Sequence, residues 1–132
     1  MDVAIRRLVA QRAANRCEYC HLPQAAAPLA LFHVEHIVAQ QHVVDDSMEN
    51  LALACPDCNR YKGPNVATVD PQSRQLIVLF NPRLDLWDDH FQRDGPRITG
   101  RSPIGEATVR LLQMNSNKRV ELRRELQSSG EM

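Results

Sequence analysis

The sequence has few aromatic residues and no long apolar segment. Aromatic side chains make up 5% of the 132 residues, so we expect a modest, aliphatic core. The longest apolar run, residues 76–80, is far shorter than the roughly 20 residues that a membrane-spanning helix requires. Arg6, Arg7 and Arg12 interrupt the first residues, which is unlike a secretory signal. We therefore expect one cytoplasmic domain over residues 1–132, without a membrane partner.

An excess of charge of either sign is also absent. The chain has 16 basic and 16 acidic residues, and this neutral balance is untypical of a passive nucleic-acid coat protein. The charges are unevenly distributed, because residues 97–124 hold seven basic residues and only two acids. The basic ones are Arg97, Arg101, Arg110, Lys118, Arg119, Arg123 and Arg124. This segment is either a solvated face or a contact to a DNA backbone.

Cysteine is limited to four residues, which form two Cys-x-x-Cys pairs. Cys17 and Cys20 make the first pair and Cys55 and Cys58 the second, with 34 residues between the pairs. This spacing lets both sulfurs of a turn reach one metal ion, and four thiolates complete the shell of a structural zinc. In a reducing compartment such pairs are metal ligands rather than disulfides. We therefore predict one structural Zn²⁺ per chain, with no open position for a substrate.

Redox-active dithiols are the alternative interpretation of these cysteines. A thioredoxin-type motif requires a strand before Cys-x-x-Cys and a helix after it, within a βαβ unit. Neither pair has that context, and the matched spacing also disfavours a set of unrelated buried thiols.

Hydrophobic periodicity and turn residues predict a mixture of helices and strands. We expect helices at residues 3–15, 56–62, 105–114 and 117–127, strands at 30–38 and 51–54, and a hairpin over 66–80. The turn of that hairpin is expected at residues 70–73. Residues 81–100 contain Pro82, Gly95 and Pro96 and are expected to be irregular, and the tail 128–132 to be frayed.

Candidate ligands of a second kind lie between and just after the cysteine pairs. They are Glu35, His36, Asn50 and Asn59. A carboxylate and amides suit a hard divalent cation such as Mg²⁺ or Mn²⁺, and a neutral imidazole can activate water. Each residue alone also has a structural interpretation: a solvated Glu35, a hydrogen-bonded core His36 or a turn cap at Asn50.

The order of these residues resembles the HNH endonuclease family, in the branch with a four-cysteine zinc knuckle. The resemblance covers residues 17–63 and rests on three motifs. They are Glu35-His36-Ile37, then Asn50-Leu51, then Cys55-x-x-Cys58-Asn59-x-x-Lys62. It implies an α+β fold with a ββα-metal (His-Me finger) core over 17–63 and an N-terminal helix. An extension over 64–127 would add a β-hairpin and C-terminal helices.

The resemblance also implies a metal-dependent endonuclease that hydrolyses phosphodiester bonds of double-stranded DNA, in a bacterium or phage. His36 would be the general base, Glu35 and Asn59 would bind the catalytic Mg²⁺, Mn²⁺ or other divalent ion, and Asn50 would pin the loop that orients His36. Clean cleavage of both strands by so small a single-site domain would favour a homodimer.

Three neighbours of these residues are assigned to the site with them. Arg60 and Lys62 follow the last motif position and are expected to contact substrate phosphates. His33 is either a neighbour of the site or a packing residue. Adjacent strand residues face opposite sides, so Glu35 and His36 can serve one site only if the strand ends or bulges there.

The sequence departs from the family pattern at three places. Ala39 replaces a frequent proline, Val43-Val44 replaces a frequent Gly-Gly turn, and Asn59 stands where other members have histidine. The departures at Ala39 and Val43-Val44 support an alternative function, a catalytically inactive, zinc-stapled module that binds nucleic acid or protein, whereas Asn59 in place of histidine favours an oxygen-preferring metal ion over zinc in the active site. The joint presence of Glu35, His36 and the two asparagines favours the enzyme.

Overall fold

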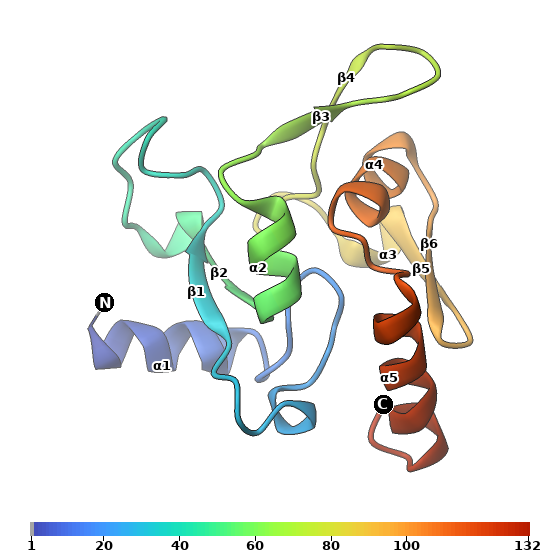
Figure 1. The fold of residues 1–132 in the computed structure, drawn as a ribbon. Helices are drawn as coiled ribbons and strands as arrows, with labels where there is room; N and C mark the ends of the chain where they lie inside the picture. The colour runs from blue at the N-terminus through green and yellow to red at the C-terminus, as the bar shows by residue number, and fades with distance from the viewer. Residues whose placement is uncertain (1) are drawn as a thin grey trace.

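The computed structural model describes residues 2–132, which form short helices and three two-stranded antiparallel sheets (Figure 1). The predicted α+β class is thereby confirmed. In chain order the elements are α1 (Val3–Arg12), the 3₁₀ turn η1 (Gln24–Ala26), β1 (His33–His36), the 3₁₀ turn η2 (Met48–Asn50), β2 (Leu51–Ala54), α2 (Pro56–Lys62), β3 (Ala67–Val69), β4 (Leu76–Val78), α3 (Trp87–His90), β5 (Phe91–Asp94), β6 (Arg97–Gly100), α4 (Pro103–Leu111) and α5 (Asn117–Ser128). Within residues 2–132, no helix has the length and apolar character needed to cross a membrane.

The centre of the fold is a strand, a loop, a strand and a helix, in the order predicted for a ββα-metal core. β1 and β2 pair antiparallel, with Glu35 opposite Ala52. α2 begins at Pro56, which suits a first turn because that position needs no amide partner. It ends before Gly63, whose φ of 51° side-chain-bearing residues rarely adopt. The predicted bounds of β2 and α2 are confirmed.

β1 is shorter than the predicted strand over residues 30–38. Its partner β2 offers four residues, because η2 precedes it and α2, capped by Cys55, follows it. β1 therefore ends at His36. This end of the strand is the condition under which Glu35 and His36 can face one site.

α1 is also shorter than predicted, and it is tied to the ββα core. It ends at Arg12 because Ala14 and Asn15 have positive φ angles of 54° and 55°, which stop a right-handed helix. The Arg12 guanidinium donates to the carbonyls of Met48 and Leu51 at 2.8 and 2.6 Å. These bonds hold the start of β2 in place.

The predicted hairpin over residues 66–80 is present as β3 and β4, which project from the rest of the molecule at the top of Figure 1. Its turn lies where the sequence places it, because the Asp70 amide donates to the Gln75 carbonyl at 2.9 Å. The Asp70 carboxylate accepts from the amides of Gln72 and Ser73, as acidic turn residues commonly do.

The prediction that residues 81–100 are irregular is wrong. They form α3 and a second hairpin, in which Asp94 pairs with Arg97 across Gly95 and Pro96. Gly95 has a φ of 58°, the conformation that a two-residue hairpin turn requires at its first position. Gly95 and Pro96 therefore connect two strands instead of interrupting a strand.

The last two helices are close to the predicted ones. α4 begins at Pro103 rather than at residue 105, because Ser102 caps it by accepting from the Gly105 amide. α5 continues through Ser128, and the Glu131 amide donates to the Leu126 carbonyl at 2.8 Å. The helix therefore extends one residue beyond its predicted end at residue 127.

Buried side chains of the ββα core and of the extension form one cluster. Phe32, Phe80 and Phe91 are all buried, so the core is less purely aliphatic than predicted. The Phe80 ring lies edge-on to the ring of Phe91 at 5.1 Å and to that of Tyr19 at 6.3 Å between centroids. These contacts join the extension to the first cysteine pair.

Candidate zinc site and active site

The four cysteines come together as one metal site. Their sulfurs all lie within 4.8 Å of one another, and each residue is buried. A tetrahedral zinc with sulfurs at about 2.3 Å separates neighbouring sulfurs by about 3.8 Å. The Cys20 and Cys55 sulfurs are 3.7 Å apart, so the donor set fits Zn²⁺. Burial raises the pKa of the Cys17 and Cys58 thiols, whereas a bound metal ion would deprotonate them.

Hydrogen-bond donors surround these sulfurs. The Cys20 amide lies 3.5 Å from the Cys17 sulfur, and the Cys58 amide lies 3.4 Å from that of Cys55. Arg119 of α5 donates to the Cys58 sulfur at 3.0 Å and is itself buried. A zinc ion with four thiolates carries a net charge of −2. The positive guanidinium of Arg119, which belongs to the C-terminal extension, partly compensates this negative charge.

A shallow hollow of about 340 Å³ brings together Glu35, His36 and Asn59. Glu35 and His36 are the last two residues of β1, and Asn59 lies in α2. One carboxylate and one amide oxygen on a solvated hollow fit Mg²⁺ or a similar ion, which keeps several waters in its shell. The structure thus brings together the three residues to which the sequence assigns the catalytic metal and the general base.

Asn50 is buried and fixes the loop between β1 and β2. Its side-chain amide donates to the carbonyls of Val38 and Asp45 at 3.0 and 2.8 Å, and its oxygen accepts from the Val38 amide at 2.9 Å. These bonds close the loop at both ends. The predicted pinning of the loop by Asn50 matches these contacts.

The loop carries a site residue that the sequence interpretation missed. Asp46 Oδ1 lies 2.7 Å from His36 Nε2 and also accepts from Gln40 Nε2 at 3.2 Å. The hydrogen bond with His36 and, to a smaller extent, the hydrogen bond with Gln40 hold the pKa of Asp46 below its ordinary value. The signal in the sequence is the acidic pair at residues 45 and 46, which by itself does not indicate a contact with His36.

Glu35 is buried, with 6% of its surface exposed, and both carboxylate oxygens have partners. Tyr19 donates its hydroxyl hydrogen to Oε1, and Lys62 Nζ lies 3.2 Å from Oε2. Burial raises the pKa of Glu35, while the charge of Lys62 and the bond from Tyr19 act against that rise. Burial and the charge of Glu35 raise the pKa of Tyr19 well above its ordinary value, so its hydroxyl remains a donor.

The prediction that Lys62 contacts a substrate phosphate is wrong. Lys62 is 1% exposed, and its ammonium donates to the Ile37 carbonyl at 2.9 Å as well as facing Glu35. It follows Asn59 by three residues, so both lie on the side of α2 that faces β1. Arg60 points outward, with 67% of its side chain exposed, and remains accessible to a phosphate.

Two further predicted positions differ in the structure. His33 lies exposed at the far end of β1 and is not among the residues that line the hollow. The predicted basic face is smaller than expected, because Arg119 and Arg123 are buried. Both guanidinium groups bond to main-chain carbonyls, those of Leu112 and Pro96 among them.

Comparison with protein families supports the motif interpretation. Residues 17–65 match the family described as HNH endonuclease. The match spans both cysteine pairs and all the residues that line the hollow. Searches among curated proteins and among solved structures found no significant match.

Proposed function

Residues 17–65 carry an HNH endonuclease domain, and from it we propose that the protein is a metal-dependent endonuclease that hydrolyses phosphodiester bonds of DNA. The observation that carries this proposal is the convergence of Glu35, His36 and Asn59 on one hollow, in a chain whose four-cysteine metal site consists of other residues. The four-thiolate site has no open position, so it would support the fold while the hollow supports the reaction.

In this proposal, His36 accepts the proton of the attacking water. If Nε2–H is donated to Asp46, the ring orientation is fixed and Nδ1 is left with the free lone pair. Asn50 contributes by holding the loop that carries Asp46. A divalent ion held by Glu35 and Asn59 would supply Lewis-acid stabilisation of the phosphoryl charge.

Duplex DNA is the proposed substrate, and the exposed Arg60 is the candidate phosphate contact. Its guanidinium lies 4.7 Å from the centre of the Tyr61 ring, and its Nη2 donates to Asp57 and to the Tyr61 hydroxyl, which limits its orientations. Its Nε and Nη1 donate to no other group among the described residues, so they are the donors assigned to a phosphate. Simultaneous cleavage of both strands would favour two copies of the chain, because Glu35, His36 and Asn59 form a single catalytic set in one hollow.

The decisive experiment compares the purified protein with His36→Ala on supercoiled plasmid, in Mg²⁺, Mn²⁺ or EDTA. We expect nicking by the original protein with a divalent ion, and a loss of about 10²–10⁴-fold in rate for the variant. His33→Ala is the matched control, because His33 is the exposed histidine at the other end of the same strand. Equal nicking by the original protein and His36→Ala would refute the role of His36.

The alternative of an inactive binding module is supported by the engaged state of Glu35, whose two oxygens already have protein partners. That function would give plasmid binding in a mobility-shift assay and no cleavage with any metal ion. The two proposals therefore differ in one measurement.

A further inference from the structure

We infer that Tyr19 is a positioning residue for the metal-binding carboxylate of Glu35, and that the C-terminal extension acts on the active site through Tyr19. This inference rests on the proposed nuclease function, because it takes Glu35 as a ligand of the catalytic ion. Tyr19 touches neither the hollow nor the candidate phosphate contact, so its role is indirect.

The first step is the arrangement around Glu35. Its two oxygens have different partners, the Tyr19 hydroxyl on Oε1 and the Lys62 ammonium near Oε2. An ionised carboxylate offers about four acceptor positions, so each oxygen keeps at least one beyond its protein partner, and the proposed function assigns these to the metal ion. Two partners on two oxygens fix the rotation of the carboxylate group, which a single partner would leave free.

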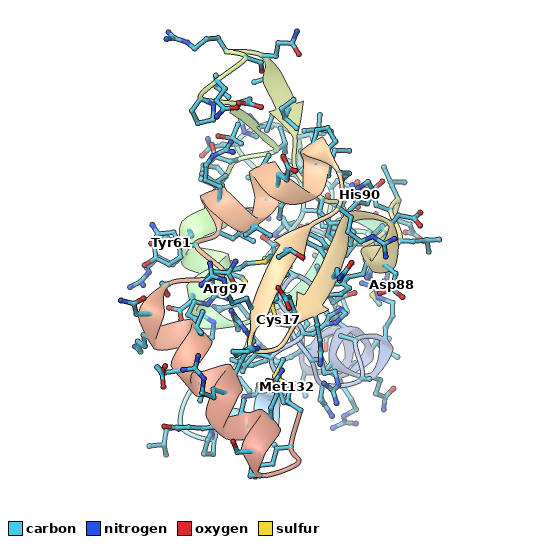
Figure 2. The ribbon with its side chains drawn as sticks, turned by 90° about the vertical axis from the view of Figure 1, so that its right-hand side faces the viewer. Cys17, Tyr61, Asp88, His90, Arg97 and Met132 are labelled. Atoms are coloured by element: carbon cyan, nitrogen blue, oxygen red, sulfur yellow. The ribbon has the colours of Figure 1, made fainter. Side chains whose placement is uncertain are left out.

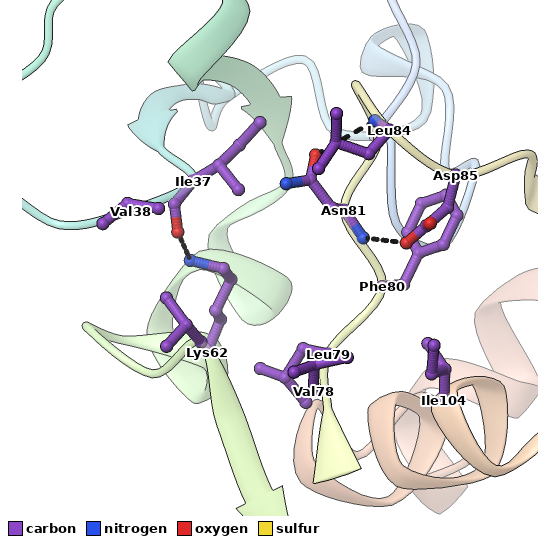
Figure 3. Close-up of a pocket in the computed structure, with 11 residues that line it drawn as sticks. Ile37, Val38, Lys62, Val78, Leu79, Phe80, Asn81, Leu84, Asp85 and Ile104 are labelled. Atoms are coloured by element: carbon purple, nitrogen blue, oxygen red, sulfur yellow. Dashed lines mark hydrogen bonds between the residues drawn. The ribbon is translucent and has the colours of Figure 1, made fainter.

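The second step concerns what holds each of these two partner side chains in place. Lys62 is anchored independently, because its ammonium also donates to the Ile37 carbonyl, as Figure 3 shows. Tyr19 has no second hydrogen bond at its hydroxyl among the described residues, so its position depends on what holds its ring and backbone.

The third step is that the extension holds Tyr19. The Trp87 indole donates to the Tyr19 carbonyl at 2.8 Å, and the Phe80 ring packs edge-on against the Tyr19 ring. On the other side, Tyr19 lies between the zinc ligands Cys17 and Cys20. Tyr19 therefore connects the zinc knuckle and the extension to the carboxylate. A bond of this kind to a metal ligand typically changes metal affinity by about 10–100-fold when it is removed.

The sequence offers a matched pair for the test, because the chain has two tyrosines. Tyr61 lies on α2, and its hydroxyl accepts a hydrogen bond from Arg60. Figure 2 shows Tyr61 apart from Cys17, the zinc ligand two residues before Tyr19. Mn²⁺ binding to zinc-loaded protein is measured by electron paramagnetic resonance, with zinc content and melting temperature recorded in parallel. We expect Tyr19→Phe to weaken Mn²⁺ binding about 10-fold or more and Tyr61→Phe to leave it unchanged.

Trp87→Phe tests the connection to the extension. It removes the bond to the Tyr19 carbonyl and retains an aromatic ring, so we expect a smaller weakening of Mn²⁺ binding. Because Trp87 is inferred to act through the Tyr19 hydroxyl, the double variant should bind Mn²⁺ no more weakly than Tyr19→Phe alone. Additive losses would overturn the connection.

The outcomes separate this inference from the proposed function. Unchanged Mn²⁺ affinity in a folded, zinc-loaded Tyr19→Phe protein would overturn the inference, as would the absence of any Mn²⁺ binding by the original protein. If Tyr19→Phe does not fold, Trp87→Phe becomes the test. Unchanged Mn²⁺ binding by Trp87→Phe would then overturn the inference. Mn²⁺ binding without plasmid cleavage would refute the proposed function and leave the positioning role to be judged from the variants.

Discussion

At the scale of single residues, Arg119 is the side chain most closely tied to the zinc site from outside the HNH segment. It donates to the Cys58 sulfur at 3.0 Å, and its second guanidinium nitrogen donates to the Leu112 carbonyl at 2.7 Å. Burial lowers the pKa of this group, but the thiolates of Cys58, Cys20 and Cys55 raise it overall. The charge of Arg119 is therefore matched to a thiolate cluster and not to a DNA phosphate.

Replacing Arg119 by Met retains most of the side-chain length and removes the donors and the charge. We expect zinc to bind about 10–100-fold more weakly, because the net negative charge of the zinc–thiolate cluster loses its buried counter-charge. Competition with a chromophoric zinc chelator measures this change. Arg124→Met is the control, since Arg124 lies on the same helix with 55% of its side chain exposed. Equal zinc affinities for the two variants would contradict the assignment.

At the scale of elements, the β5–β6 hairpin supports the helix that carries Arg119. Figure 2 shows α5 running past this hairpin, and Arg123 and Gln127 donate to the carbonyls of Pro96 and Gly95 at 2.6 and 2.8 Å. Both carbonyls belong to the two-residue turn. The conformation of that turn therefore affects the docking of α5.

Gly95→Ala tests this turn without creating a steric clash, because a Cβ atom at Gly95 would meet no atom within 4 Å. The positive φ alone should destabilise the fold by about 1 kcal/mol. The melting temperature should then fall by a few degrees, roughly 3–5 °C for a domain of this size. Gly95→Asn should cost less, because asparagine tolerates this conformation. An unchanged melting temperature in Gly95→Ala would show that the turn can adopt another conformation.

The elements differ in how far the sequence predicts them. α2 is predicted at its observed bounds because Cys55, Pro56 and Gly63 mark its two ends by local chemistry. The β5–β6 hairpin is missed because its turn residues also act as strand breakers elsewhere. In α5 the buried residues include Arg119 and Arg123 beside Val120 and Leu126. Apolar spacing in the sequence cannot reveal this buried face of α5. Its two arginines are buried because they bond to thiolates and carbonyls that only the folded chain brings near them.

The residues of the candidate site also differ in how far the sequence predicts them. Glu35, His36, Asn50 and Asn59 follow from their order in the sequence. The direction of Lys62 was available from its spacing to Asn59, which places both on one side of the helix. Tyr19 contacts Glu35 through the packing of the first cysteine turn, and Asp46 contacts His36 through the folding of the loop, so single-residue patterns do not identify them.

At the scale of the whole molecule, the zinc site joins parts of the chain that are distant in sequence. The four cysteines belong to the same buried cluster as Val9 near the N-terminus and Leu112 near the C-terminus. Zinc binding to such sites contributes roughly 10–16 kcal/mol, whereas an entire domain is stable by about 5–15 kcal/mol. The zinc ion is therefore expected to decide whether this chain is folded.

Cys58→Ser tests this dependence. The variant should lose zinc, the helical circular dichroism signal and a cooperative thermal transition, because its three remaining thiolates no longer complete the metal shell. His36→Ala serves as the control and should retain all three, since His36 lies at the solvated hollow and outside the thiolate cluster. Chelation strong enough to remove Mg²⁺ or Mn²⁺ but not zinc should likewise leave the melting temperature of the original protein unchanged. A Cys58→Ser protein that melts at the original temperature would contradict a zinc-dependent fold, and the positions of Tyr19 and Glu35 would then have to be maintained by the apolar core alone.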